Sequence, residues 1–139
     1  MEQVSKCRNQ EGDRHYYKVS KPNKGSVHFR IFRQNIRGLA RKSDELLCHL
    51  LPYAPHVLCL TEHHLRNEEI CSTYLDRYSL GGNFCRKTFR QGGVCIYVSL
   101  NIQFNTINLD QHNKEKDLEI CAINIHLPSR RLTVICLYR

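Results

Sequence analysis

Two of the strands that this sequence predicts are apolar on both faces, and this constrains the fold more than any other feature. The run Val57–Thr61 is continuously apolar up to its last residue, which is typical of a strand covered on both sides. In residues 118–125, apolar side chains again point to both faces of the predicted strand. The sequence therefore predicts a sheet that needs a packing layer on each side.

The only substantial helix is predicted from Ser43 to Leu51, where leucines recur on one face and Pro52 ends the pattern. Further strands are predicted at residues 28–33, 78–84, 94–98 and 132–138, with one short helix within 67–78. One helix followed by several strands indicates an α/β (α+β) fold. A helix of about nine residues cannot cover five strands. We therefore expect that a second layer is missing or that a partner supplies it.

The composition excludes several classes of protein. The chain of 139 residues is long enough for one domain. It contains no run of about 18 apolar residues, which excludes a membrane-spanning helix. Its first 30 residues contain no apolar stretch typical of a secretory signal. We expect an intracellular protein that is not secreted and does not bind a membrane.

The eight cysteines predict neither disulfides nor an obvious zinc site. Disulfides are not expected without a secretory signal, and paired ligands such as Cys-x-x-Cys are absent. Most cysteines lie in apolar runs and are predicted to be small, buried hydrophobic residues. A metal-binding scaffold that uses His56, Cys59, His63 and His64 stays open as an alternative.

The net charge of +8 is concentrated near the N-terminus. Residues 1–45 hold 11 Lys and Arg against 5 Asp and Glu, which suits a polyanionic partner. We expect these basic residues to bind DNA, or RNA. A solvated basic arm without a partner is the alternative. Residues 1–27 show no sustained periodicity and are predicted to form a disordered extension outside the fold, which begins at residue 28.

Three polar residues stand at the ends of predicted strands, where open sheets place their sites. They are Asn35, Glu62 and Tyr138. A carboxylate in this position can hold Mg²⁺, which prefers oxygen ligands. The amide can orient a phosphate or a ligated water, and the phenol can donate a hydrogen bond to a phosphoryl oxygen. Each also has a purely structural interpretation, as a turn residue, a solvated loop residue or an amphipathic residue at the edge of the core.

Four segments, in order along residues 28–139, resemble the endonuclease/exonuclease/phosphatase superfamily. Their sequences are QNIRGL (34–39), LCLTEHHL (58–65), GGVCIYV (92–98) and ICLYR (135–139). The chain is most similar to the apurinic-endonuclease-like domain that precedes the reverse transcriptase in LINE-type non-LTR retrotransposons. His63 departs from the more usual Thr of this family, and His64 falls where relatives often have His but is assigned no catalytic role.

The resemblance implies a four-layer α/β sandwich with two mixed, mostly antiparallel sheets. It also implies Mg²⁺-dependent hydrolysis of phosphodiesters, a nuclear site of action, and nicking of target DNA to prime reverse transcription. Asn35 matches the residue that orders the metal and phosphate site, Glu62 matches the metal ligand, and Tyr138 matches the residue that contacts the scissile phosphate.

The family's Asp-x-Asn and Ser-Asp-His segments do not occur in these 139 residues and are expected beyond Arg139. Residues 28–139 then correspond to the N-terminal half of the domain, and we expect no activity from this chain alone, because positioned base and electrophilic groups are missing. We also expect an exposed sheet face, poor solubility and molten behaviour unless the missing half or another chain covers it. The alternative function is a non-catalytic nucleic-acid-binding module that uses the basic N-terminal region.

Overall fold

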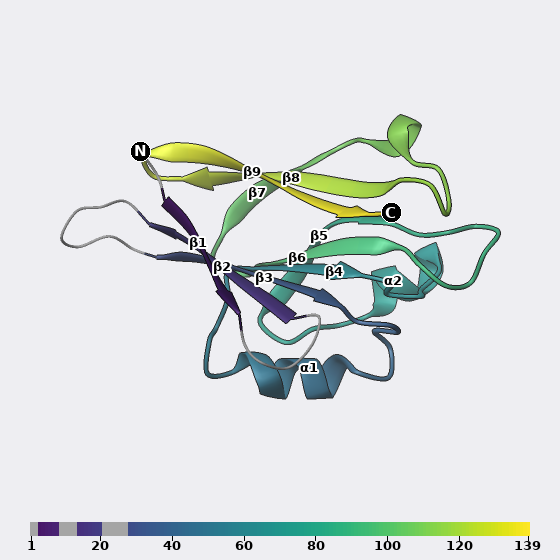
Figure 1. Cartoon of the computed structure of the whole chain (residues 1–139), viewed down its shortest axis with the longest axis horizontal. Coiled ribbons are helices and arrows are strands. Elements are labelled where there is room, and N and C mark those ends of the chain that lie inside the picture. Colours follow the sequence, from purple (N-terminus) through teal and green to yellow (C-terminus); the bar gives the residue numbers. More distant parts are fainter. Residues whose placement is uncertain (1–2, 9–13, 21–27) are drawn as a thin grey trace.

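The computed structural model describes residues 3–8, 14–20 and 28–139, which form nine strands, two α helices and one 3₁₀ turn (Figure 1). In chain order these are β1 (Gln3–Arg8), β2 (Arg14–Ser20), β3 (Phe29–Asn35), α1 (Ser43–Leu50), β4 (Val57–Thr61), α2 (Asn67–Ser72), β5 (Tyr78–Phe84), β6 (Val94–Ser99), β7 (Gln103–Ile107), η1 (Asp110–His112), β8 (Glu119–Leu127) and β9 (Arg130–Tyr138). The α+β class is confirmed. Neither described α helix is long and apolar enough to cross a membrane.

Six strands form one sheet in the order β1-β2-β3-β4-β6-β5, and three form a second sheet in the order β7-β8-β9. Among the described strands only the pair β3 and β4 is parallel, because α1 carries the chain back across the sheet between them. The sheets are therefore mixed and mostly antiparallel, as expected.

The prediction that residues 1–27 lie outside the fold is wrong for residues 3–8 and 14–20. These residues form β1 and β2, and β2 pairs with β3 along its length. Tyr16 of β2 is only 8% exposed and packs its ring against Phe32 and Tyr53. Few apolar side chains mark β2 in the sequence, so its alternation is weak. The remaining residues of the predicted extension (1–2, 9–13 and 21–27) lie outside the described residues.

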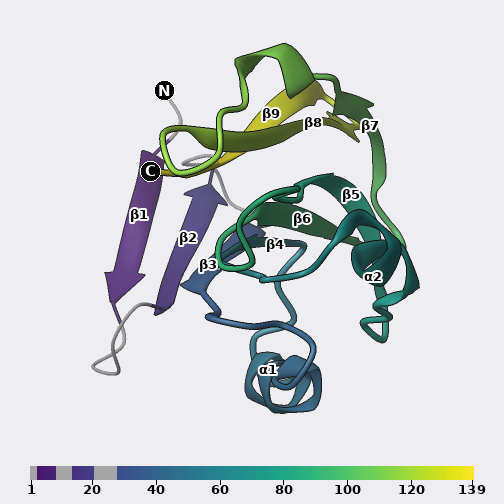
Figure 2. The same ribbon diagram turned by 90° about the vertical axis from the view of Figure 1, so that its right-hand side faces the viewer.

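The second sheet lies across one face of the larger sheet (Figure 2). Strand β8 packs on β5 and β6, and β9 packs on β4 and β6. Gly81 of β5 allows this close approach, because a Cβ atom there would lie 3.3 Å from Ile123 Cγ2 of β8. The expectation that this chain leaves the face of its sheet uncovered is thus wrong for β4, β5 and β6, since β7, β8 and β9 themselves supply the layer.

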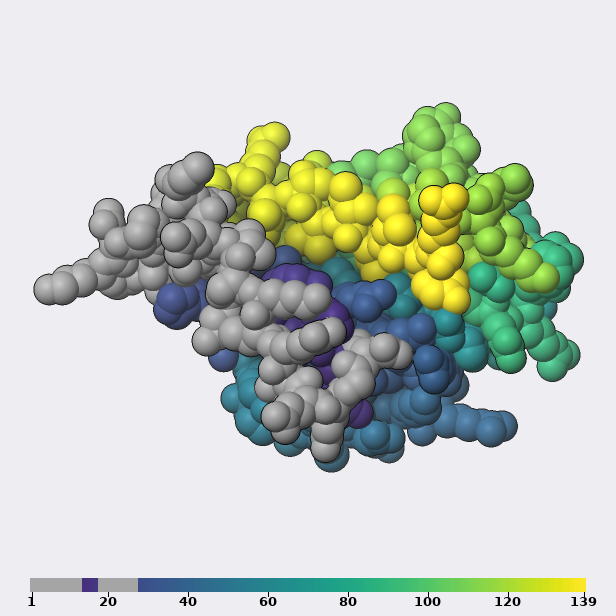
Figure 3. All heavy atoms as spheres, viewed as in Figure 1, coloured from purple at the N-terminus to yellow at the C-terminus, as the bar shows by residue number. Residues whose placement is uncertain are grey.

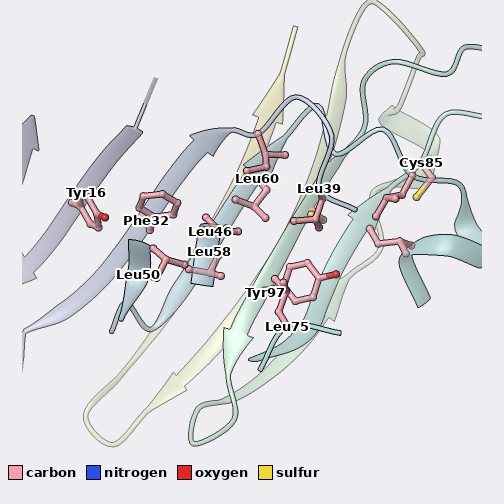
Figure 4. Close-up of a cluster of buried hydrophobic side chains, with 14 residues drawn as sticks. Tyr16, Phe32, Leu39, Leu46, Leu50, Leu58, Leu60, Leu75, Cys85 and Tyr97 are labelled. Atoms are coloured by element: carbon pink, nitrogen blue, oxygen red, sulfur yellow. The ribbon is translucent and has the colours of Figure 1, made fainter. Parts of the chain in front are cut away.

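Helix α1 covers the opposite face of the larger sheet, where a second group of buried side chains gathers (Figure 4). Leu46 and Leu50 of the helix are 3% and 2% exposed, and burying each contributes about 2 kcal/mol. Leu51 was predicted on the same face but follows the helix and is 63% exposed. The two apolar groups explain why β4 is apolar on both faces: all five of its residues are buried between them.

Candidate functional site

The structure brings Asn35, Glu62 and Tyr138 together, although Glu62 and Tyr138 are 76 residues apart in the chain. Asn35 is the last residue of β3 and pairs in register with Thr61, the last residue of β4. Because β3 and β4 are parallel, Glu62 leaves the sheet beside Asn35. Strand β9 packs on β4 and places its last residue, Tyr138, at the same edge.

The carboxylate of Glu62 is the centre of the cluster. Its Oε1 atom accepts hydrogen bonds from Asn35 Nδ2 at 3.0 Å and from the Tyr138 hydroxyl at 2.6 Å. Its Oε2 atom lies 3.8 Å from His64 Nε2. The Glu62 side chain is 20% exposed, so one side of the carboxylate faces solvent while the other is held by neutral donors.

The backbone around Glu62 is held in an uncommon conformation. Glu62 and His64 have positive φ angles of 54° and 61°, which non-glycine residues adopt rarely and at a cost. Backbone hydrogen bonds maintain this geometry: Gly38 N donates to Glu62 O at 2.8 Å, and His64 N donates to Gly92 O at 2.9 Å. The loops that follow β3 and β4 and the glycine pair before β6 therefore fix the direction of the carboxylate.

The hydrogen bonds also determine the protonation of the cluster. Burial raises the pKa of Glu62, but the hydrogen bonds from Tyr138 and Asn35 and the charges of His64 and Arg37 outweigh it, so this pKa lies below its ordinary value. The hydrogen bond to Glu62, together with burial, raises the pKa of Tyr138. At neutral pH the cluster therefore holds an ionised carboxylate and a protonated phenol.

The free oxygen atoms of the cluster suit a hard cation. Among the residues that the structure describes, no donor reaches the buried Asn35 Oδ1 atom, and the contact of Glu62 Oε2 is the long one, of 3.8 Å, with His64 Nε2. Enzymes often hold Mg²⁺ through one or two carboxylates, with waters and substrate phosphates as further ligands. Within residues 3–8, 14–20 and 28–139, no group of three His, Cys, Asp or Glu could hold a metal ion. Glu62 and Asn35 thus fit Mg²⁺ only as a partial ligand set.

A buried ion pair between Arg86 and Glu119, which was not predicted from the sequence, lies next to Tyr138. Glu119 pairs in register with Tyr138 across β8 and β9 and is 1% exposed, and Arg86 is 9% exposed. The Arg86 guanidinium donates to Glu119 Oε1, and Gly93 N donates to Glu119 Oε2 at 2.7 Å. Glu119 stands on the same face of β8 as the buried Cys121. This charged residue at an inward-facing position is the feature of the sequence that could have indicated the buried ion pair.

The four residues of the alternative zinc site do not converge. His56 accepts a hydrogen bond from Arg30 N and stacks on Phe29, while Cys59 is buried between the two sheets. His63 is fully buried; Leu65 N donates to its Nδ1 atom, so its Nε2 atom carries the proton and donates to Phe84 O at 2.9 Å. His63 is therefore a neutral structural residue, and burial keeps its pKa low.

Comparison with models of known protein families found no match to this chain, and comparison with curated proteins found none either. Neither comparison therefore supplies a protein whose residues could be matched to the Asn35–Glu62–Tyr138 cluster.

The lowered pKa of Glu62 predicts a pH-dependent contribution to stability. A carboxyl group whose pKa is lower in the folded state stabilises the protein at neutral pH and loses that contribution as the pH falls through the folded-state pKa. Glu62→Gln should therefore lower the free energy of unfolding at pH 7, and the difference from the wild type should shrink as the pH falls from about 5 to about 3. Urea unfolding at several pH values measures this, with the exposed Glu68→Gln as the control. A constant difference across that range would contradict it.

Proposed function

We propose that the Asn35–Glu62–Tyr138 cluster is the cation- and phosphate-binding part of a Mg²⁺-dependent phosphodiesterase site, of the kind that nicks DNA in LINE-type retrotransposons and acts in the nucleus. The observation that carries the proposal is the ionised Glu62 carboxylate, held between Asn35 and Tyr138 at the carboxyl ends of neighbouring strands. The four segments that resemble that family support the same assignment.

Each residue of the cluster has a distinct role in this proposal. Glu62 would hold the Mg²⁺, which supplies Lewis-acid polarisation of a phosphoryl oxygen when it is bound. Asn35 donates to Glu62 through Nδ2, and a small rotation of its side chain would bring the buried Oδ1 atom to a ligated water or to the cation. Tyr138 keeps its proton and can redirect its hydroxyl from Glu62 to a phosphoryl oxygen that carries negative charge.

These residues form only part of a hydrolytic site. In-line attack on a phosphodiester also needs a group that positions and deprotonates water, and the Asp-x-Asn and Ser-Asp-His segments that do this in the family are absent from the 139 residues. We therefore expect the chain to bind Mg²⁺ together with a phosphodiester but not to hydrolyse it at a measurable rate.

Binding of an oligonucleotide with and without Mg²⁺ tests the proposal. With a fluorescein-labelled duplex, Mg²⁺ should increase the affinity of the wild type. In Glu62→Gln the factor by which Mg²⁺ raises the affinity should be at least about tenfold smaller, a loss that is common when residues around a metal site are changed. Glu68→Gln on the exposed face of α2 is the matched control. If Glu62→Gln keeps the full Mg²⁺ effect, the cluster does not bind the cation. Nicking of supercoiled plasmid by the wild type would show that the site is complete.

A nucleic-acid-binding module is the second candidate, because the basic side chain of Arg37 acts on the cluster and further basic residues lie nearby in the sequence. Arg37 and Arg41 are exposed in the segment between β3 and α1, and the charge of Arg37 lowers the pKa of Glu62. This function predicts DNA or RNA binding that persists in EDTA and weakens steeply with salt. Arg37→Ala with Arg41→Ala should reduce both the affinity and the salt dependence, whereas Arg77→Ala should not. Binding that requires Mg²⁺ would contradict this candidate.

A further inference from the structure

Thr61, the last residue of β4, lies beside Asn35 and directly before Glu62 in the chain. Its side chain is 0% exposed, and among the residues that the structure describes nothing forms a hydrogen bond with its Oγ1 atom. The Oδ1 atom of Asn35 is also buried and also lacks a partner there. Two such atoms on neighbouring residues call for an explanation, because buried polar groups are nearly always hydrogen-bonded.

The register of the larger sheet places both side chains on one face. Asn35 and Thr61 are paired residues of the parallel strands β3 and β4, whose backbones lie about 4.8 Å apart in a regular sheet. Because side chains alternate along a strand, Thr61 shares its face with Cys59 and Asn35 shares its face with Phe29. Both Cys59 and Phe29 belong to the buried group between the two sheets. The side chains of Asn35 and Thr61 therefore point toward the second sheet.

Strand β9 covers this pair of residues from the second sheet. It packs on β4, and Figure 3 shows β9, in yellow, lying against the blue and teal segments that include β3 and β4. The polar side chains of β9 in this region already have partners. Cys136 donates through Sγ to Leu60 O at 3.7 Å, and Tyr138 donates its hydroxyl proton to Glu62. Neither of them pairs with the two unpartnered oxygen atoms.

The other unpartnered side-chain atoms near this edge face elsewhere. His64 Nε2 lies 3.8 Å from Glu62 Oε2, and Gln34 precedes Asn35 on β3, so its side chain points to the opposite face of the sheet. The Thr61 hydroxyl is then the donor that the register brings to Asn35 Oδ1. A turn about χ1 of Thr61 closes the gap between the two atoms, as does one water, which can bridge oxygen atoms up to about 5.5 Å apart.

We propose that Thr61 is a positioning residue for the candidate site. Its hydroxyl donates to Asn35 Oδ1, directly or through one buried water, and so fixes the amide whose Nδ2 atom donates to Glu62. The bond to Glu62 alone leaves the amide plane free to pivot, because χ2 of asparagine is a soft torsion. A second bond at the other end of the amide restricts it to small rotations.

This restriction is compatible with the binding of a cation at the site. An amide oxygen has two acceptor positions, so a bond from Thr61 leaves one position of Asn35 Oδ1 for a ligated water or for the cation. The effect of Thr61 on cation binding rests on the proposed function, whereas its effect on the orientation of Asn35 does not. The two effects can therefore be measured separately.

Two variants of the intact chain separate the hydroxyl of Thr61 from its packing. In NMR spectra without divalent cations, the side-chain amide of Asn35 should be rigid in the wild type and in Thr61→Ser, which keeps the hydroxyl. In Thr61→Val its protons should exchange with solvent about fivefold to tenfold faster, in line with the loss of one hydrogen bond. A packing role alone predicts the reverse order, because Thr61→Ser removes a buried methyl group and Thr61→Val keeps the shape.

The second measurement is the factor by which Mg²⁺ raises the affinity for the labelled duplex. Thr61→Val should reduce this factor about tenfold, a common loss when the residues that orient metal ligands are changed, and Thr61→Ser should retain it. Thr73→Val is the matched control, since the Thr73 hydroxyl donates to Glu69 O outside the cluster. It should behave as the wild type does in both measurements.

The outcomes distinguish this inference from the proposed function. A mobile Asn35 amide in the wild type, or an amide equally rigid in Thr61→Val, would overturn the positioning role, as would a Mg²⁺ effect that Thr61→Val keeps in full. If Mg²⁺ has no effect on the wild type but Thr61→Val still loosens Asn35, the proposed function fails and the positioning of Asn35 by Thr61 stands.

Discussion

Replacing Glu119 by alanine should lower the free energy of unfolding by about 3–5 kcal/mol, because it leaves the buried charge of Arg86 without a partner. Glu119 accepts hydrogen bonds from Arg86, from Gly93 N at 2.7 Å and from Lys116 N at 3.1 Å. All three donors lose their acceptor in this variant, and Arg86 is only 9% exposed. Urea unfolding followed by circular dichroism measures the loss.

Two further variants separate the charge from simple truncation. Glu68→Ala removes an exposed carboxylate and should change the free energy of unfolding by less than about 0.5 kcal/mol. Combining Arg86→Met with Glu119→Leu removes both charges and should restore part of the stability, since apolar pairs often replace buried ion pairs without loss. A loss below 1 kcal/mol in Glu119→Ala would show that the ion pair is solvated or absent.

Replacing Gly93 by alanine should lower the free energy of unfolding by about 3 kcal/mol, from backbone strain and overpacking together. Gly93 has a φ angle of +87°, and a Cβ atom there would lie 2.4 Å from His63 Nε2. The ring of His63 cannot move away easily, because both of its nitrogen atoms are hydrogen-bonded.

Gly38→Ala is the matched control for this second variant. Gly38 also has a positive φ angle, of +101°, but the nearest atom to its Cβ position is His64 Nδ1 at an ordinary 3.6 Å. This variant should carry the backbone strain without the steric clash and should lose clearly less stability. Equal losses in the two variants would contradict the packing of His63 against Gly93.

Both predictions concern residues that support the candidate site. Glu119 pairs with Tyr138 in register, and Gly93 lies beside His63, the residue that follows Glu62. Loss of either contact should therefore loosen the position of Glu62 or Tyr138 as well as the fold.

Much of the fold could be predicted from local patterns. Helix α1 follows from its leucines and from Pro52, and β4, β6 and β8 follow from their apolar runs. Strand β7 (Gln103–Ile107) was missed, because most of its side chains are polar and exposed. The division into two sheets could not be predicted either, since strand runs do not show which strand packs across another.

The candidate site was predictable because each of its residues follows directly from the end of a strand. The sequence places Asn35, Glu62 and Tyr138 at strand ends, and the structure joins them by hydrogen bonds. The positive φ angle of Glu62 and the ion pair between Arg86 and Glu119 depend on contacts between distant segments. No local pattern reveals such contacts, although the inward position of Glu119 indicated an unusual buried charge.

The most direct test of the cation site is an NMR titration of the isotope-labelled chain with Mn²⁺, whose unpaired electrons broaden the signals of nearby nuclei. The proposed site predicts that the side-chain amide of Asn35 and the backbone amides of Glu62 and Tyr138 broaden first, and that Mg²⁺ competes. Glu62→Gln should remove this broadening, whereas Glu68→Gln should retain it. Broadening that begins elsewhere, or that persists unchanged in Glu62→Gln, would contradict a cation site at Glu62.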